Sequence, residues 1–188
     1  MPVTINGSGS IAGLSVGGLG SGVVNTATLE NGAAAGVKLG SGSVIQTVSS
    51  TFAPYGDAGS DRGSSTSYSD TGIVLSITPT VSTSKILVLS EGGSFGYKLN
   101  DSQVDYYMRL AGTPSGGSLT EFREIEVRMT NMGNTTQRLF DSWNMSYLHD
   151  HNGTVAIEYK VQHKFGVACT YCWARYRGAT MTLMEIAV

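Results

Sequence analysis

The chain has 188 residues, of which 40% are hydrophobic and 14% are charged, whereas roughly 25% charged residues are usual in soluble globular proteins. The net charge is −2 and the basic residues are scattered, which argues against nucleic-acid binding, because that function needs clustered Lys and Arg. No stretch approaches the roughly 20 apolar residues of a membrane span, and the first residues lack the basic segment of a secretory signal, so we expect no membrane insertion.

The first 45 residues differ from the rest in composition. The 5 Phe, 2 Trp and 9 Tyr all lie at Phe52 or later, and 11 of the 25 Gly lie before Val44. Glu30 and Lys38 are the only charged residues before Phe52. One copy of such a segment cannot bury enough apolar area to offset the entropy of ordering its glycines. The sequence therefore predicts an extended attachment or trimerisation segment over 1–45, ordered by other copies or a partner, with a flexible Gly/Ser linker as the alternative.

Residues 46–188 show the pattern of β-strands. Alternating apolar and polar residues, or short apolar runs, predict strands at 71–78, 85–89, 124–129, 155–162 and 180–186. The pattern is least clear over 139–150. Turn residues fill the gaps, and Asn152-Gly153 suits a tight hairpin turn. About eight strands with regular turn signals predict an all-β domain, an antiparallel β-sandwich or jelly-roll-like head.

No catalytic or cofactor site is recognisable in the sequence. The 3 His have no Ser or Cys nucleophile context. Glu124 and Glu126 alternate with apolar residues, which indicates an exposed strand face and not a glycosidase acid pair. The Gly-rich run 18–22 is followed by neither a helix nor Gly-Lys-Ser/Thr, both of which a phosphate-binding loop needs. We therefore expect no enzyme and no cofactor.

His149 and His151 form an HxH pattern. Residues i and i+2 of a strand point the same way, and around a threefold axis such pairs could supply six nitrogens to a transition metal. Asn152-Gly153 follows at once and indicates a solvated turn. We expect no metal, and HxH ligation is the alternative.

Cys169 and Cys172 form a single CxxC pattern. A structural zinc site needs four ligands, and the chain has only these 2 Cys. A redox pair would be expected at a helix N-terminus, whereas this pair lies in a predicted β context. Two reduced thiols and a short-range disulfide both remain open.

Aromatic clusters give the best indication of a binding surface. Aromatic faces combined with Arg donors suit contacts with sugars or proteins. Because neighbours on a strand face opposite sides, alternate members are expected in the core instead. The candidate receptor contacts are Tyr106, Tyr107, Tyr171, Trp173, Arg175 and Tyr176.

Two stretches of the second part carry a family resemblance. They run from Thr66 through Pro79 into Ser84–Val88, and from Tyr176 to Ile186. They resemble a β-domain found in tail-fibre and other virion proteins of marine and cyanobacterial phages, over 46–188. Residues 24–40 are similar to the repetitive leader of such fibres. The resemblance implies a homotrimeric virion protein, assembled in the host cytoplasm, with no catalytic residues to transfer; the sequence departs from it at Cys169–Tyr176, where relatives carry polar residues.

The composition and the resemblance together favour a short homotrimeric phage tail fibre. Segment 1–45 would dock to other virion proteins at the tail or baseplate, and the head would contact a host-surface glycan or protein. A capsid decoration or cement protein, or a head fibre, is the alternative. A polysaccharide depolymerase is disfavoured by the short length, the absent β-helix repeats and the missing acid pair.

Overall fold

The chain forms two units, which are described separately. The computed structural model describes residues 4–5, 11–12, 40–52, 65–98, 104–129, 137–166 and 173–188. The units are Met1–Lys38 and Leu39–Val188. In the first, strand β1 (Thr4–Ile5) pairs antiparallel with β2 (Ile11–Ala12). The predicted boundary after residue 45 lies just inside the first strand of the second unit, which begins at Val44.

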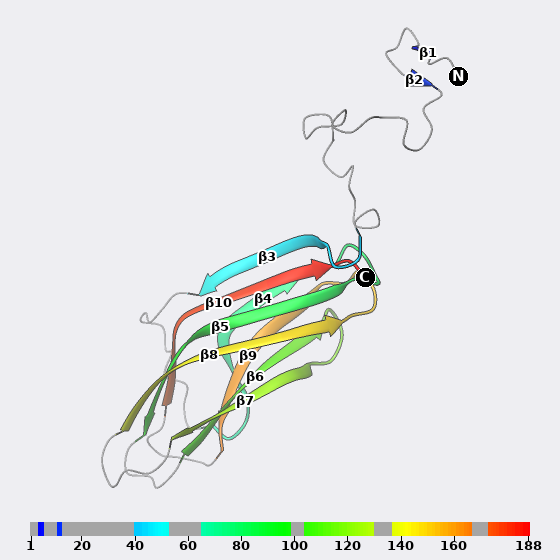
Figure 1. Ribbon diagram of the computed structural model, residues 1–188. Helices are drawn as coiled ribbons and strands as arrows, with labels where there is room; N and C mark the ends of the chain where they lie inside the picture. The colour runs from blue at the N-terminus through cyan, green and yellow to red at the C-terminus, as the bar shows by residue number, and fades with distance from the viewer. Residues whose placement is uncertain are drawn as a thin grey trace. The chain divides into compact units, whose positions relative to one another are not determined.

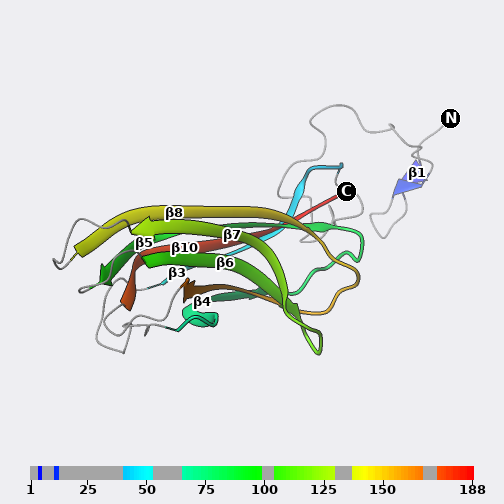
Figure 2. The same cartoon turned by 90° about the horizontal axis from the view of Figure 1, so that it is seen from below.

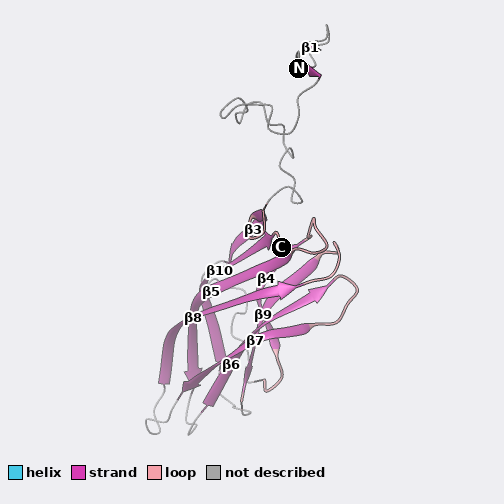
Figure 3. Ribbon diagram, turned by 45° about the vertical axis from the view of Figure 1, so that its right-hand side comes forward, coloured by secondary structure: helices cyan, strands magenta, loops and turns pink. Residues whose placement is uncertain are grey.

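The second unit is a sandwich of two four-stranded antiparallel sheets (Figure 1). One sheet has the order β3-β10-β5-β8 and the other β4-β9-β6-β7. The strands are β3 (Val44–Phe52), β4 (Ser69–Ile77), β5 (Lys85–Lys98), β6 (Val104–Pro114), β7 (Thr120–Met129), β8 (Gln137–Asp150), β9 (Ile157–Phe165) and β10 (Trp173–Ile186). The described residues contain no helix (Figure 3), and so none that could span a membrane.

The strand pairing is that of a jelly roll. Strands pair in a nested series, β3 with β10, β4 with β9, β5 with β8 and β6 with β7, as in one long hairpin. The additional pairs β10–β5 and β9–β6 roll this hairpin into two sheets. Two Greek keys of eight strands define the jelly roll, so the prediction of an all-β, jelly-roll-like sandwich is confirmed.

Most predicted strands lie within observed ones, and the unclear stretch 139–150 belongs to β8. The predicted hairpin turn at Asn152-Gly153 is wrong, because β8 and β9 lie in different sheets. Gly153 has a φ of 99° where the chain crosses between the sheets. A hairpin does join β6 to β7, where Gly117 N donates to Pro114 O over 2.8 Å.

The core fills the space between the sheets with alternate residues of their strands. The first sheet contributes Ile86, Val88, Trp143, Met145, Met181 and Leu183, and the second Ile73, Ile77, Tyr106, Met108, Leu110, Ile157, Tyr159, Val161 and Phe165. Burying such aliphatic and aromatic side chains supplies about 1.5–3 kcal/mol each relative to exposure. The head therefore has a large apolar core of its own.

Aromatic rings close one edge of the sandwich. Strands β7 and β8 are edge strands of opposite sheets and run along the same side (Figure 2). Phe122 of β7 stacks on Tyr147 of β8, with centroids 4.7 Å apart and planes at 11°. His149 lies next to the same Phe122 ring, at 4.6 Å. These contacts cover the core along this edge of the sandwich.

Candidate functional site

Strand alternation separates the two predicted contact residues Tyr106 and Tyr107. Tyr106 is 4% exposed and its ring lies 5.5 Å from that of Phe165. It is therefore a core residue and not a receptor contact, because it points between the sheets. Tyr107 points to the outer face and is half-buried, and Lys164 Nζ lies 4.9 Å from its ring centroid.

The other predicted contacts are not placed. Tyr171 lies outside the described residues, as do Cys169 and Cys172. Trp173, Arg175 and Tyr176 belong to β10, and their side chains are outside the described part of the chain. Their predicted roles, and the state of the two thiols, stay predictions.

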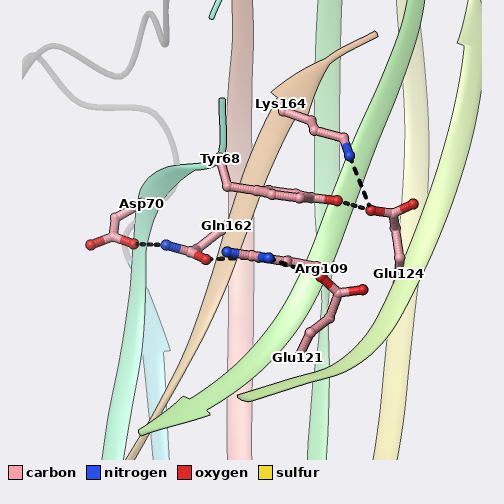
Figure 4. Close-up of polar contacts among 7 residues, drawn as sticks. All are labelled: Tyr68, Asp70, Arg109, Glu121, Glu124, Gln162 and Lys164. Carbon is pink, nitrogen blue, oxygen red and sulfur yellow. Dashed lines mark hydrogen bonds and ion pairs between the residues drawn. The ribbon is translucent and has the colours of Figure 1, made fainter. Parts of the chain in front are cut away.

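A polar cluster covers the outer face of the β4-β9-β6-β7 sheet. Its members, called the Tyr68 cluster here, come from all four strands and from the segment preceding β4 (Figure 4). They are Tyr68, Asp70, Arg109, Glu121, Glu124, Gln162 and Lys164.

Both faces of the Tyr68 ring are covered by cations. The guanidinium carbon of Arg109 lies 3.8 Å from the ring centroid and Lys164 Nζ lies 4.4 Å from it. Figure 4 shows these groups on opposite sides of the ring. The hydroxyl of Tyr68 donates to Glu124, which also pairs with Lys164 Nζ at 3.4 Å. Because the ring is already stacked, it offers no free platform for a ligand.

Arg109 connects the cluster laterally. Its Nε donates to Gln162 Oε1 over 2.9 Å and its Nη1 to Glu121 Oε2 over 2.8 Å. Gln162 Nε2 in turn donates to Asp70 Oδ1 over 2.6 Å. The cluster is thus satisfied internally, and it holds the start of β4 against β9, β6 and β7. The sequence gives little signal for Tyr68, because it precedes β4 and has no strand alternation. Arg109 was predictable, because alternation places it on the same outer face of β6 as Tyr107.

The two histidines of the HxH pattern point into the sandwich. His149 Nδ1 is hydrogen-bonded to the Tyr159 hydroxyl at 2.6 Å. His151 Nδ1 donates to Gly153 O over 3.0 Å, and its Nε2 lies 3.1 Å from Ser84 Oγ. Both nitrogens of His151 are therefore engaged within the chain. Among the described residues no group of three or more potential metal ligands converges.

Burial shifts the pKa values of His149 and Tyr159, the two residues joined by this hydrogen bond. Burial lowers the pKa of His149 below 6.5, the neighbouring His151 lowers it further, and Asp150 partly opposes them. Burial also raises the pKa of Tyr159. Both groups are held in their neutral forms at neutral pH, which fits a hydrogen bond inside the fold.

A buried carboxylate ties the end of β10 to the β4–β5 connection. Glu185 is fully buried and accepts hydrogen bonds from Thr80 N, Val81 N, Ser84 Oγ and Gln46 Nε2 at 2.6–3.0 Å. Burial alone would raise its pKa, but these hydrogen bonds outweigh it and lower the pKa to about 2. A signal for this group was present, because Glu185 shares the strand face of the apolar Leu183.

A groove crosses the outer face of the other sheet, over β10, β5 and β8. It consists of two adjoining hollows of about 370 Å³ each, which share Glu91, Asn144 and Thr180, and this size falls within the range of small-ligand sites. The side chains facing it include Leu89, Glu91, Asn144, Ser146, Thr180 and Thr182. Sequence reasoning missed this groove, because its residues come from three strands that are far apart in the chain.

A β-bulge shapes one end of the groove. Arg177 pairs with Gly93 and Thr180 with Glu91, so two residues of β10 oppose one of β5. Gly178, within the bulge, has a φ of 46°, a left-handed conformation that glycine adopts without strain. Opposite it, a Cβ on Gly92 would lie 3.0 Å from the Trp143 ring. This missing Cβ points toward the buried Trp143 and Ala179, so Gly92 lets the Trp143 ring pack close beneath the sheet, while Gly92 and Gly178 line the hollow at this end of the groove.

Comparison with known proteins gives no family. No family model matches the chain, and no curated protein matches it.

The solved structures that resemble this chain do so only distantly. They include latent PorU of Porphyromonas gingivalis, with 11% identity over 74% of this chain and 13% of PorU, at a TM-score of 0.37. The VP2 subviral particle of infectious bursal disease virus matches with 11% identity over 76% of this chain and 34% of VP2, at a TM-score of 0.37. The CBM22-1 xylan-binding domain of Paenibacillus barcinonensis Xyn10C matches with 9% identity over 79% and 97%, at a TM-score of 0.27. These likenesses are too weak to carry a functional argument.

Proposed function

We propose that this chain is a structural protein of a phage virion, a short homotrimeric tail fibre attached through residues 1–45. The observation that carries the proposal is the contrast between the two parts of the chain. The head has an aromatic and aliphatic core of its own, whereas the leader has no aromatic residue and two charged ones. A segment of that kind gains order from neighbouring copies or from other virion proteins.

The head is the part that contacts the host surface in this proposal. Its outer faces differ in a way that supports a division of labour. The Tyr68 cluster is satisfied by its own hydrogen bonds and ion pairs, which suits a stabilising role. The groove over β10, β5 and β8 is hollow and presents polar and apolar groups together, which suits recognition. The sequence resemblance to phage fibre domains points to the same assignment.

Native mass spectrometry of the purified full chain tests the assembly. A trimer is expected, and a stable monomer would remove the homotrimeric fibre. Labelling the protein in intact virions then tests its location. Label at the tail in a few tens of copies or fewer supports the fibre.

A capsid decoration or cement protein is the second candidate. The 14% share of charged residues suits a protein whose surfaces are covered by neighbours in a shell. Hundreds of copies distributed over the capsid would favour this candidate and contradict the tail fibre.

We further propose that the protein acts without catalysis. The sequence motifs of a glycosidase acid pair are absent, and Glu124 is engaged by Tyr68 and Lys164. Incubation with host polysaccharide followed by a reducing-end assay checks this point. Release of new reducing ends would identify a depolymerase instead.

A further inference from the structure

The polar side chains of the groove have hydrogen-bonding capacity that the fold leaves unused. Thr180, Glu91 and Asn144 form one cross-strand row, and Thr182, Leu89 and Ser146 the next. Thr182 Oγ1 shares a hydrogen bond with Ser49 at 2.9 Å. Within the described part of the chain, the side chains of Thr180, Glu91, Asn144 and Ser146 make no hydrogen bond. This contrasts with the Tyr68 cluster, where the polar groups satisfy one another.

The geometry of the groove matches a ligand with several hydroxyl groups. Neighbouring strands lie about 4.8 Å apart, so the row from Thr180 to Asn144 spans about 10 Å. Along it lie a hydroxyl, a carboxylate and an amide, which together can both donate and accept hydrogen bonds. Leu89 is 38% exposed in the adjacent row and supplies an apolar contact. A sugar ring presents the same combination, hydroxyl groups at its edge and C–H groups on its face.

Charge and topology exclude two other classes of ligand. Glu91 is the only charged residue among the described residues of the groove, so from these residues an anionic ligand meets a like charge and no cation. An extended peptide commonly binds a sheet by adding a strand at its edge. Strand addition to this sheet occurs at its edge strands, β3 and β8, so a peptide added there lies beside the sheet and not on the face that carries the groove.

From these features we infer that the groove over β10, β5 and β8 binds a neutral oligosaccharide. Glu91 and Asn144 hydrogen-bond its hydroxyl groups, Thr180 and Ser146 contact its ends, and Leu89 packs against a ring face. The inference rests on the proposed function, since it specifies what the head recognises on the host. It extends that proposal to a defined site that involves neither Tyr107 nor the Tyr68 cluster.

Trp143 provides a reporter for this site. Its side chain is 5% exposed and lies beneath the groove. The chain has 2 Trp, so a Trp173→Phe variant leaves Trp143 as the only indole. Maltohexaose, cellohexaose and mannohexaose serve as neutral probes, and hexagalacturonate is the anionic counterpart. We expect at least one neutral hexamer to shift the Trp143 fluorescence saturably, and hexagalacturonate to leave it unchanged. Calorimetric titration of the unmodified chain repeats the measurement without relying on the Trp variant.

Variants locate the binding. Asn144→Ala removes an amide, and Glu91→Gln replaces one carboxylate acceptor by an N–H donor and removes the charge; each is expected to weaken binding about fivefold. Ser146→Trp fills the groove from the exposed face of β8 and abolishes binding. Glu158→Gln is the matched control, because Glu158 is an exposed carboxylate on the opposite sheet. The affinity of this variant for the neutral hexamer is expected to stay unchanged.

Four results would overturn the inference. The first two are failure of all three neutral hexamers to bind at millimolar concentration and equal binding of hexagalacturonate. The third is undiminished binding by the Ser146→Trp variant. The fourth is a response to peptides, supplied as a tryptic casein digest, without a response to the hexamers. Each is distinct from failure of the fibre proposal, which is decided by the native mass and by the location in the virion. A monomer that binds a neutral hexamer would keep the groove and remove the fibre.

Discussion

Ser84 Oγ donates a hydrogen bond of 2.7 Å to Glu185 Oε1, across 101 residues of sequence. The same hydroxyl oxygen lies 3.1 Å from His151 Nε2. Through this contact the β4–β5 connection, the β8–β9 crossover and the last strand meet at one end of the sandwich. The carboxylate acts as a common acceptor for backbone and side-chain donors that would otherwise be buried without partners.

Replacing Glu185 by Gln is expected to destabilise the head by about 3 kcal/mol. The amide group would direct its own N–H donors at donors of Thr80, Val81 or Ser84, leaving buried groups unpaired, and such groups cost about 1–3 kcal/mol each. Urea unfolding at neutral pH measures the change in the free energy of unfolding. Glu158→Gln, on an exposed strand face, is expected to stay within about 0.5 kcal/mol of the parent. Equal stability of the two variants would contradict the role given to Glu185.

The free energy of unfolding of the parent head should fall more steeply with decreasing pH than that of the Glu185→Gln variant. The pKa of Glu185 is lowered from 4.5 to about 2 in the folded chain. In that interval the unfolded state binds more protons, so stability falls as the pH falls. The stabilisation is fully present above pH 4.5 and is lost as the pH approaches 2. The variant lacks this carboxyl group, so the slope of its unfolding free energy against pH should be smaller. An unchanged slope would show that Glu185 titrates normally.

His149 should titrate below 6.5, the ordinary value for its imidazole. Burial is the main cause of the lowered pKa, and His151 adds to it. Because the unfolded chain binds this proton first as the pH falls, protonation of His149 opposes folding below pH 6.5. NMR of the imidazole C–H signals measures the pKa directly. Titration of the assigned His149 signal at or above 6.5 would contradict the burial of the neutral ring.

Arg109→Lys is expected to cost about 1 kcal/mol. A guanidinium can stack on the Tyr68 ring while donating to Gln162 and Glu121, whereas an ammonium cannot make all three contacts from one place. Thermal unfolding compares this variant with Arg123→Lys, which changes an exposed residue of β7. Equal unfolding temperatures would indicate that the Tyr68 cluster adds nothing to stability.

The strands were predictable because alternation is a local property of the sequence. The sequence did not decide which of Tyr106 and Tyr107 faces the core. Alternation indicates only that the two side chains point to opposite faces of the sheet. The turn at Asn152-Gly153 was misassigned, because a Gly with positive φ fits both a hairpin and a crossover between sheets. Only the strand order distinguishes these cases.

The sites were harder to predict because their parts are far apart in the chain. The groove needs the bulge at Gly178, whose effect depends on the pairing of β10 with β5. The acceptor role of Glu185 depends on donors that lie 101 to 139 residues earlier. The strand pattern records which residues point inward, whereas the register that brings these residues together is a property of the folded sheets.

Gly112 on β6 offers a test of the packing between the sheets. A Cβ at this position would lie 2.5 Å and 2.8 Å from two ring atoms of Phe122, and 3.2 Å from the Tyr159 ring. Gly112→Ala should therefore cost about 1–3 kcal/mol, the usual penalty of overpacking. Gly40→Ala is the control, since nothing lies within 4 Å of its added Cβ.

A second substitution separates ring displacement from a backbone effect. In Gly112→Ala with Phe122→Leu, the smaller side chain makes room for the methyl group. The double variant should then lose less stability than the sum of the single variants, because neighbouring residues that share one space couple. If the changes in the free energy of unfolding were strictly additive in urea unfolding, Phe122 would not be the group that the new methyl displaces. The loss of stability in Gly112→Ala would then come from the strand backbone itself.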